Sequence, residues 1–233
     1  MSEPFAMSGY GQYCPLALAS EILGERWTLL VLREIMLGAR HFNDIHRGVP
    51  RMSRTLLSRR LRTLETAGII EHSQSAKGSS DYLLSQSGQE LMPIIESLAV
   101  WGKEWVPGTL SEERADPDLI VWDMHRRLAL EQLPEVRTVI EFQFPDQPAK
   151  KQQRWLVGDH SGMVMCVTDP GIETDLAVVT DSRTLVLVWY GDLPLQRAID
   201  EQRIRLHGPG WLCRAFPRWL LLSPMAEVAC KGT

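Results

Sequence analysis

Residues 50–68 read PRMSRTLLSRRLRTLETAG, a segment crowded with arginine and leucine in a chain of 233 residues whose formal net charge is −4. On a helical wheel Leu57, Leu61 and Leu64 fall within about 40° of one another and form one apolar stripe. Small hydroxyl residues and guanidinium groups lie about 100° to 200° away on the wheel. These residues are Thr55, Ser58, Arg59, Arg62 and Thr66. The pattern predicts a helix that packs its leucines inward and presents a positive face outward.

The outer face of this predicted helix has the chemistry of a DNA-reading surface. A guanidinium group can donate two hydrogen bonds to guanine or bind a phosphate, and short hydroxyl residues let a helix enter the major groove deeply. Free amides and the dipole at the helix start, where Ser53 can act as the cap, favour phosphate contact. The alternative is that the arginines only solvate an exposed face. We expect double-stranded DNA as the partner, with contacts from Arg51, Ser53, Arg54, Thr55, Ser58, Arg59 and Arg62.

The flanking sequence predicts a turn before this helix and a hairpin after it. HFNDIHRGV indicates a short helix over residues 41–47, which Gly48 and Pro50 end. IIEHSQSAKGSSDYLLS, residues 69–85, places two strand-like runs around a Gly/Ser/Lys centre, which is typical of a hairpin. We expect this hairpin to act as a wing, with Lys77 and Ser79 at the DNA backbone or minor groove. Helical spacing over residues 15–38 and 86–106 completes the order helix, helix, helix, hairpin, helix.

These segments resemble the HxlR-type winged helix-turn-helix transcriptional regulators over about residues 13–106. The most specific matches are CPLALA, GERWTLLVLREIMLGARHFNDI and LSRRLRTLETAGII. The resemblance implies a sequence-specific regulator whose SRTLLSRRL helix enters the major groove. It also implies a homodimer in which the first helix and the helix ending near Trp105 form the contact, so the operator should be an inverted repeat.

Cys14 has a structural and a functional interpretation. Pro15 removes one amide donor and no partner cysteine lies nearby in the sequence, which favours a buried or inert thiol. Several members of the resembled family use a cysteine at this position as a thiol switch. The alternative function is therefore a redox-sensing regulator, with the second half of the chain as an oligomerisation or interaction module.

Composition restricts the class of protein further. The four cysteines, Cys14, Cys166, Cys213 and Cys230, lie far apart without a CxxC or Cys/His cluster, so we expect no metal site, no cofactor and no disulfide framework. No apolar run is long enough for a membrane span, and the first residues lack the sections of a signal peptide. We expect a cytoplasmic protein.

A change of composition near Leu110 indicates two domains. VPGTLSEERADPD, residues 106–118, is rich in Pro, Gly and acidic residues and indicates a connection. Basic and acidic residues balance up to Leu110, so the excess of acidic residues belongs to the remainder. We expect a DNA-binding and dimerisation domain over residues 1–110 and a ligand-binding or interaction domain over residues 111–233.

The second half predicts an α+β domain. RTVIEFQF, RWLVGD, MVMCVTD and DLAVVTD are short β-rich runs that indicate an antiparallel sheet, and helices should flank it. The run SRTLVLVWYG fits either a strand or a buried helix. Residues 175–220 resemble the sterol carrier protein type of lipid-binding domain, in which that run would be helical and a last helix would follow a strand ending in Gly.

The sterol-carrier resemblance implies an apolar tunnel for a small apolar or lipid-like effector. Five tryptophans could line it or simply fill the core: Trp122, Trp155, Trp189, Trp211 and Trp219. An enzyme is disfavoured because His125, His160 and His207 are scattered without a catalytic order. VGDHSG fits a hairpin turn better than a relay, so we expect no catalytic residues.

Overall fold

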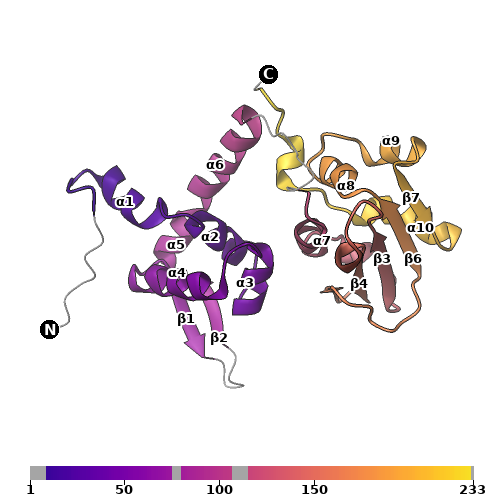
Figure 1. Cartoon of the computed structure of the whole chain (residues 1–233), viewed down its shortest axis with the longest axis horizontal. Helices are drawn as coiled ribbons and strands as arrows, with labels where there is room; N and C mark the ends of the chain where they lie inside the picture. The colour runs from indigo at the N-terminus through magenta and orange to yellow at the C-terminus, as the bar shows by residue number, and fades with distance from the viewer. Residues whose placement is uncertain (1–8, 75–79, 107–114, 232–233) are drawn as a thin grey trace. The chain divides into compact units, whose positions relative to one another are not determined.

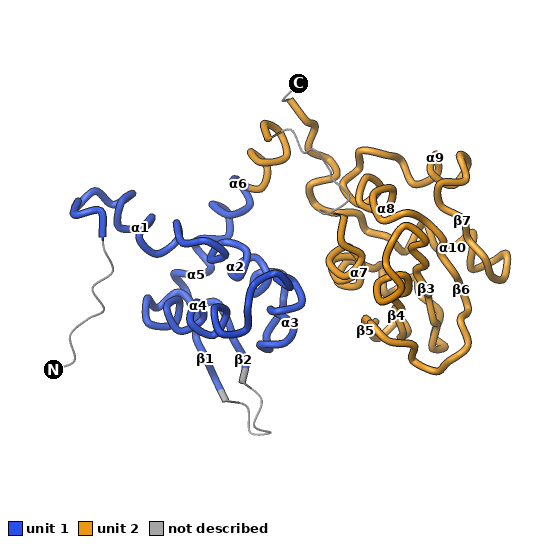
Figure 2. The backbone as a smooth tube through the Cα atoms, in the orientation of Figure 1, with its two compact units in different colours: residues 1–98 blue, residues 99–233 orange. Residues whose placement is uncertain are grey.

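A computed structural model describes residues 9–74, 80–106 and 115–231 of the chain. The chain divides into two compact units, residues 1–98 and 99–233 (Figure 2). Each unit has its own cluster of buried apolar side chains. They are called the first unit and the second unit below.

The first unit has the fold of a winged helix-turn-helix, and the predicted order of helices and hairpin is confirmed. A short helix, α5, precedes the long last helix, which starts at Met92 with Pro93 in its first turn. The elements (Figure 1) are α1 (Pro15–Leu23), α2 (Thr28–Met36), α3 (Phe42–Gly48), α4 (Arg54–Thr66), β1 (Ile70–Gln74), β2 (Ser80–Leu84), α5 (Gln86–Glu90) and α6 (Met92–Trp105). Helix α6 begins in the first unit and ends in the second.

The second unit is α+β, as the sequence predicts. Its helices are α7 (Pro117–His125), α8 (Ser182–Trp189), α9 (Leu195–Asp200) and α10 (Gly210–Trp219), with short 3-10 turns η2 (Leu130–Gln132), η3 (Ala149–Lys151) and η4 (Pro224–Glu227). Its strands are β3 (Thr138–Gln143), β4 (Gln153–Asp159), β5 (Gly162–Cys166), β6 (Leu176–Thr180) and β7 (Ile204–His207).

The sheet of the second unit is mixed, so the prediction of an antiparallel sheet is wrong. The strand order is β5-β4-β3-β6-β7, and β3 pairs with β6 in parallel from Ile140↔Leu176 onward. The other pairs are antiparallel. Strands β3, β4 and β5 form a meander, and residues 167–175 then return the chain to the far side of β3 (Figure 1). A composition-based strand prediction does not encode such a crossing.

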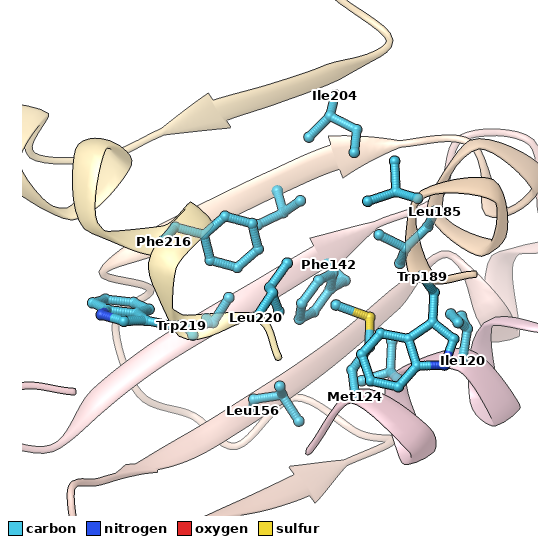
Figure 3. Packing of buried hydrophobic residues seen from close by; sticks show 14 of the residues in the cluster. Ile120, Met124, Phe142, Leu156, Leu185, Trp189, Ile204, Phe216, Trp219 and Leu220 are labelled. Carbon is cyan, nitrogen blue, oxygen red and sulfur yellow. The ribbon is translucent and has the colours of Figure 1, made fainter. Parts of the chain in front are cut away.

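Helix α8 settles the ambiguity of the run SRTLVLVWYG. Asp181 caps it, because its Oδ1 accepts from Thr184 N at 2.7 Å and its Oδ2 from Thr184 Oγ1 at 2.6 Å. One turn later the apolar side chains face the core, where Leu185 and Trp189 lie near Phe142 of β3 (Figure 3). A cap followed by a buried apolar run therefore makes this segment a helix.

The core of the second unit lies between the sheet and its helices. Phe142 is fully buried and its ring centre lies 6.3 Å from that of Phe216 on α10. Met124 of α7 approaches from the other side (Figure 3). Within the described residues, no helix is long and apolar enough to cross a membrane.

Candidate nucleic-acid interface

Helix α4 begins where Ser53 caps it. Ser53 has extended backbone, and its Oγ accepts a hydrogen bond from Leu56 N at 3.3 Å. An acceptor at this position satisfies one of the amides that the first turn leaves unpaired. The predicted cap is confirmed, and α4 starts directly after the tight turn that follows α3.

The two faces of α4 separate as the wheel predicts. Leu57, Leu61 and Leu64 are at most 1% exposed and lie in the core of the first unit. The hydroxyl and guanidinium side chains of the opposite face are exposed, apart from one half-buried serine. This face consists of Thr55, Ser58, Arg59, Arg62 and Thr66. No acidic residue stands between Ser53 and Thr63, so the face is positive up to Thr63, and the exposed Glu65 follows in the last turn.

Arg60 is an arginine of α4 that does not face outward. Its side chain is 5% exposed, and its Nη2 forms an ion pair with Glu25 Oε2. A charge this deeply buried needs such a partner. Arg60 therefore joins α4 to the segment between α1 and α2. The sequence signal for this role is its wheel position, about 60° from Leu57 on the apolar side.

Arg54 holds the start of α4 against α3. Its Nη2 donates to Asn43 Oδ1 at 2.7 Å, and its guanidinium carbon lies 4.8 Å from the centre of the Phe42 ring. A guanidinium has five N–H donors, so these contacts leave donors for a phosphate. Arg51 is exposed in the turn between the two helices. The structure thus gives Arg54 a packing role that the sequence did not indicate.

The predicted hairpin is present as β1 and β2 and is fixed to the start of α3. The two strands pair antiparallel from Ile70↔Leu84 to Gln74↔Ser80. Tyr82 N donates to Arg40 O at 2.8 Å, and His41 Nδ1 lies 3.1 Å from Asp81 Oδ1. The predicted wing contacts Lys77 and Ser79 lie outside the described residues.

The base of the hairpin also packs on the last turns of α4. The rings of His72 and Tyr82 stack with centroids 4.6 Å apart, and His72 Nδ1 lies 3.8 Å from Glu65 Oε1. Burial and the charge of Glu65 raise the pKa of Tyr82, while Arg62 lowers it. The positive charge of Arg62 therefore acts on the hairpin as well as on the outer face of α4.

Helices α1 and α6 present large apolar side chains to solvent. Leu16 and Leu18 of α1 are exposed. On α6 the exposed apolar side chains recur every three or four residues and share one side of the helix. They are Ile94, Leu98, Trp101 and Trp105. Contiguous exposed apolar surface of this kind marks interaction sites in water-soluble folds.

Cys14 is exposed, so the buried form of the expected buried or inert thiol is wrong, while its inertness stays a prediction. It stands at the N-terminal cap position of α1. The nearby backbone amides of Ala17 and Leu16 lower the pKa of its thiol, although its Sγ accepts no cap hydrogen bond from them. Pro15 does remove one amide, but the amides that follow it remain. Exposure and a lowered pKa are the conditions that a reactive thiol requires.

The five tryptophans of the second half fall into two groups. Trp122, Trp155, Trp189 and Trp219 are 1% to 6% exposed, which agrees with the core alternative, whereas Trp211 is 53% exposed on α10. An open groove of about 900 Å³ lies beside β7 between α9 and α10, and other residues line it. The structure brings none of the tryptophans to this groove.

The histidines and the VGDHSG segment, which were considered as catalytic candidates, do not form one catalytic group. Asp159 Oδ1 accepts from Ser161 N at 2.8 Å in the turn between β4 and β5, so the predicted hairpin turn is confirmed. His125 Nδ1 contacts Trp122 O within its own helix. Across residues 9–74, 80–106 and 115–231, no group of three His, Cys, Asp or Glu side chains could hold a metal ion.

Comparison with known proteins assigns the first unit. The family model described as HxlR-like helix-turn-helix matches residues 22–109. An uncharacterised HTH-type transcriptional regulator of Mycobacterium tuberculosis is 40% identical over 93 residues, which are 38% of this chain and 57% of that protein. The regulator YvaP of Bacillus subtilis is 30% identical over 98 residues, which are 41% of this chain and 91% of YvaP. This chain therefore spans little more than half of the mycobacterial relative.

Solved structures match parts of the chain with low TM-scores. The reduced form of the transcriptional regulator YodB from B. subtilis is 26% identical, with a TM-score of 0.36 over 40% of this chain and 93% of YodB. The inverting sec-alkylsulfatase Pisa1 from Pseudomonas sp. is 19% identical, with a TM-score of 0.39 over 53% of this chain and 19% of that enzyme.

Proposed function

The chain belongs to the HxlR-like helix-turn-helix family, and we propose that it is a homodimeric transcriptional regulator that reads an inverted-repeat operator through α4. Proteins of this family bind DNA and regulate transcription. The observation that carries the proposal is the outer face of α4, which is exposed, positive and uninterrupted by a carboxylate up to Thr63. Such a regulator would act in the cytoplasm, where it meets DNA.

The proposed DNA contacts divide by position on the fold. Thr55, Ser58, Arg59 and Arg62 would face base edges and flanking phosphates in the major groove. Arg51, Ser53 and Arg54 surround the start of α4, where amides and the helix dipole favour a phosphate. Lys77 and Ser79 would reach the backbone or minor groove from the hairpin.

The proposed dimer uses the exposed apolar side chains of α1 and α6. Burial of these side chains against a second copy would remove them from water, which favours association. Changing Leu98 and Trp101 together to Asp places two charges in that contact, so analytical ultracentrifugation should then give a monomer. An unchanged dimer would exclude α6 from the contact.

Selection from a random duplex library tests the operator prediction. The protein should enrich an inverted repeat with half-sites about 34 Å apart or a multiple of that distance. A variant with Arg59 and Arg62 both changed to Ala serves as the control and should enrich no motif. An asymmetric motif, or the same motif with the variant, would contradict the proposed reading by α4.

We further propose that residues 111–233 form a sterol-carrier-like domain that binds a small apolar effector. The order strand, helix, helix, strand, helix from β6 to α10 matches the resemblance, and the groove beside β7 offers space for a small molecule. Regulation would follow if the effector binds the DNA-competent and incompetent states with different affinity. Native mass spectrometry should show a dimer that retains an organic ligand, whereas ligand-free protein would favour a pure interaction module.

A redox-sensing regulator is the second candidate function, and the exposed Cys14 with its lowered pKa favours it. Oxidation of this thiol would then change DNA affinity. The variant Cys14→Ser separates the two functions in a DNA mobility assay with and without peroxide. A peroxide response that persists in the variant would exclude Cys14 as the sensor.

A further inference from the structure

The groove beside β7 carries more positive charge than a site for a purely apolar molecule requires. Arg214 and Arg218 line it from one side of α10, where they are one helical turn apart, and Arg205 lines it from β7. The guanidinium of Arg214 lies over the first turn of α10, since a Cβ added at Gly210 would sit 3.3 Å from its Nη1. The helix dipole is also positive there.

These arginines lack a carboxylate partner within the described part of the chain. No lining residue of the groove is acidic. The carboxylates of neighbouring α9 are held along their own helix, because Gln196 Nε2 donates to Asp200 Oδ1 at 2.8 Å and Arg197 Nε to Glu201 Oε1 at 2.6 Å. Guanidinium groups that share a concave surface without counter-charge attract an anion, and their planar donors suit carboxylate, sulfate or phosphate oxygens.

The remaining lining is mixed: Gln196, Gln202, His207 and Cys213 contribute polar side chains, and an apolar part comes from α9, β7 and α10. Ile199 of α9, Ile204 and Leu206 of β7 and Pro217 of α10 line the groove. Ile204 is buried and the other three are half-buried. An open volume of about 900 Å³ is large enough for a molecule of several to some tens of heavy atoms. Apolar walls favour a hydrocarbon or aromatic body by desolvation.

We propose that this groove binds a small amphipathic anion, with its acidic head at Arg205, Arg214 and Arg218 and its apolar body along the half-buried side chains of α9 and β7. This inference rests on the proposed effector function. It specifies that the apolar effector also carries an anionic group. The anionic head of such a ligand also explains why arginines, and not further apolar residues, complete the lining of the groove.

Cys213 supplies a built-in reporter for the test. It lines the groove, is half-buried and directs its Sγ toward Gly208 O at 3.6 Å. Trypsin releases it in one peptide, LHGPGWLCR, residues 206–214. Full-length protein would be treated with iodoacetamide in the presence and absence of decanoate, at a decanoate concentration below that at which decanoate aggregates. Mass spectrometry would then follow the alkylation of each cysteine peptide. Decanoate should slow alkylation of Cys213 about fivefold or more and leave Cys14 and Cys230 unchanged.

Matched ligands and variants define what would overturn the proposal. Decanol, which has the tail without the charge, and inorganic sulfate, which has the charge without the tail, should each protect Cys213 much less than decanoate. Changing Arg214 and Arg218 together to Gln should weaken decanoate protection about tenfold or more, because two charge-assisted contacts are lost. Trypsin then releases residues 206–231 as one peptide, so tandem mass spectrometry assigns the alkylation to Cys213 or Cys230. Arg183→Gln, an exposed arginine on α8 outside the groove, is the control.

Equal protection by decanol or by sulfate would overturn the amphipathic anion. Protection by duplex DNA, with none by decanoate, would overturn it in favour of a nucleic-acid surface. DNA retention is measured on the same samples, so the two proposals fail separately. Decanoate protection without DNA binding would refute the regulator function alone, and DNA binding without protection would refute the groove alone.

Discussion

Helices α4 and α10 carry one amphipathic pattern in two different units. Each buries a stripe of large apolar side chains, namely Leu57, Leu61 and Leu64 in α4 and Leu212, Phe216 and Trp219 in α10. Each places arginines on the other side. In α4 these arginines stand on an exposed face next to a hairpin, whereas in α10 they form the wall of a groove with β7 and α9. The pattern predicts how a helix packs, whereas the neighbouring elements determine which ligand its outer face can bind.

The largest expected effects come from the buried stripes. Phe216→Ala should destabilise the second unit by about 3–5 kcal/mol, and Leu61→Ala the first unit by about 2–5 kcal/mol, because each leaves a cavity. Hydrogen exchange in denaturant, followed by mass spectrometry, reports each unit separately. If either variant weakened both units equally, the division into two independent cores would be wrong.

Adjacent arginines of α4 should separate stability from DNA binding. Arg60→Met removes the partner of Glu25 and should lower the free energy of unfolding by about 1–3 kcal/mol. Arg59→Met, the matched control, should change it by at most about 0.5 kcal/mol because the side chain is exposed. Chemical denaturation measures both values. If Arg59→Met lost more unfolding free energy than Arg60→Met, Arg59 and not Arg60 would be the buried arginine.

The outer faces of the two helices should respond to different ligands. Arg59→Ala should cost about 1–3 kcal/mol of binding free energy at a cognate operator if the side chain reads a base. Arg214→Ala should leave DNA affinity unchanged in the same fluorescence anisotropy titration. Equal weakening on all sequences, with a shallower salt dependence, would make Arg59 a phosphate contact. A DNA defect in Arg214→Ala would remove the distinction between the two helices.

The smallest expected effect is a shift in the pH profile of Cys14, the exposed thiol of the first unit. The backbone amides of Ala17 and Leu16 lower its pKa, so thiolate persists at lower pH and alkylation should reach half its maximal rate at a lower pH than in a free cysteine peptide. Iodoacetamide rates across pH, read from the Cys14 peptide, measure this. A midpoint at or above that of a free cysteine peptide would contradict the helix-start geometry.

Much of the first unit could be predicted because its signals are local. The leucine stripe, the Ser53 cap and the hairpin depend on residues close together in the chain, and all three are found in the structure. The wheel position of Arg60 separates it from Arg59, but its ion-pair partner Glu25 lies far away in the sequence and could not be predicted. The exposure of Cys14 likewise follows from the surroundings of α1 and not from Pro15 beside it.

In the second unit the elements were easier to predict than their arrangement. The β-rich runs and the last helix were recognisable from apolar runs and turn residues. The parallel pairing of β3 with β6 depends on a return crossing, which leaves no local signal. The groove could not be predicted either, because Arg205 and Arg218 line it together only once β7 and α10 have folded beside it. The tryptophans predicted to line a site belong mostly to the core.

The position of β6 has a consequence for synthesis on the ribosome. A nascent chain that has emerged only through β5 can form the β3-β4-β5 meander, but the free edge of β3 still lacks its neighbour. That edge belongs to a strand with both faces buried in the finished unit, so it is a site for wrong pairing with other chains until β6 arrives. Translational pausing between Cys166 and Leu176 should therefore promote aggregation more than pausing after β6.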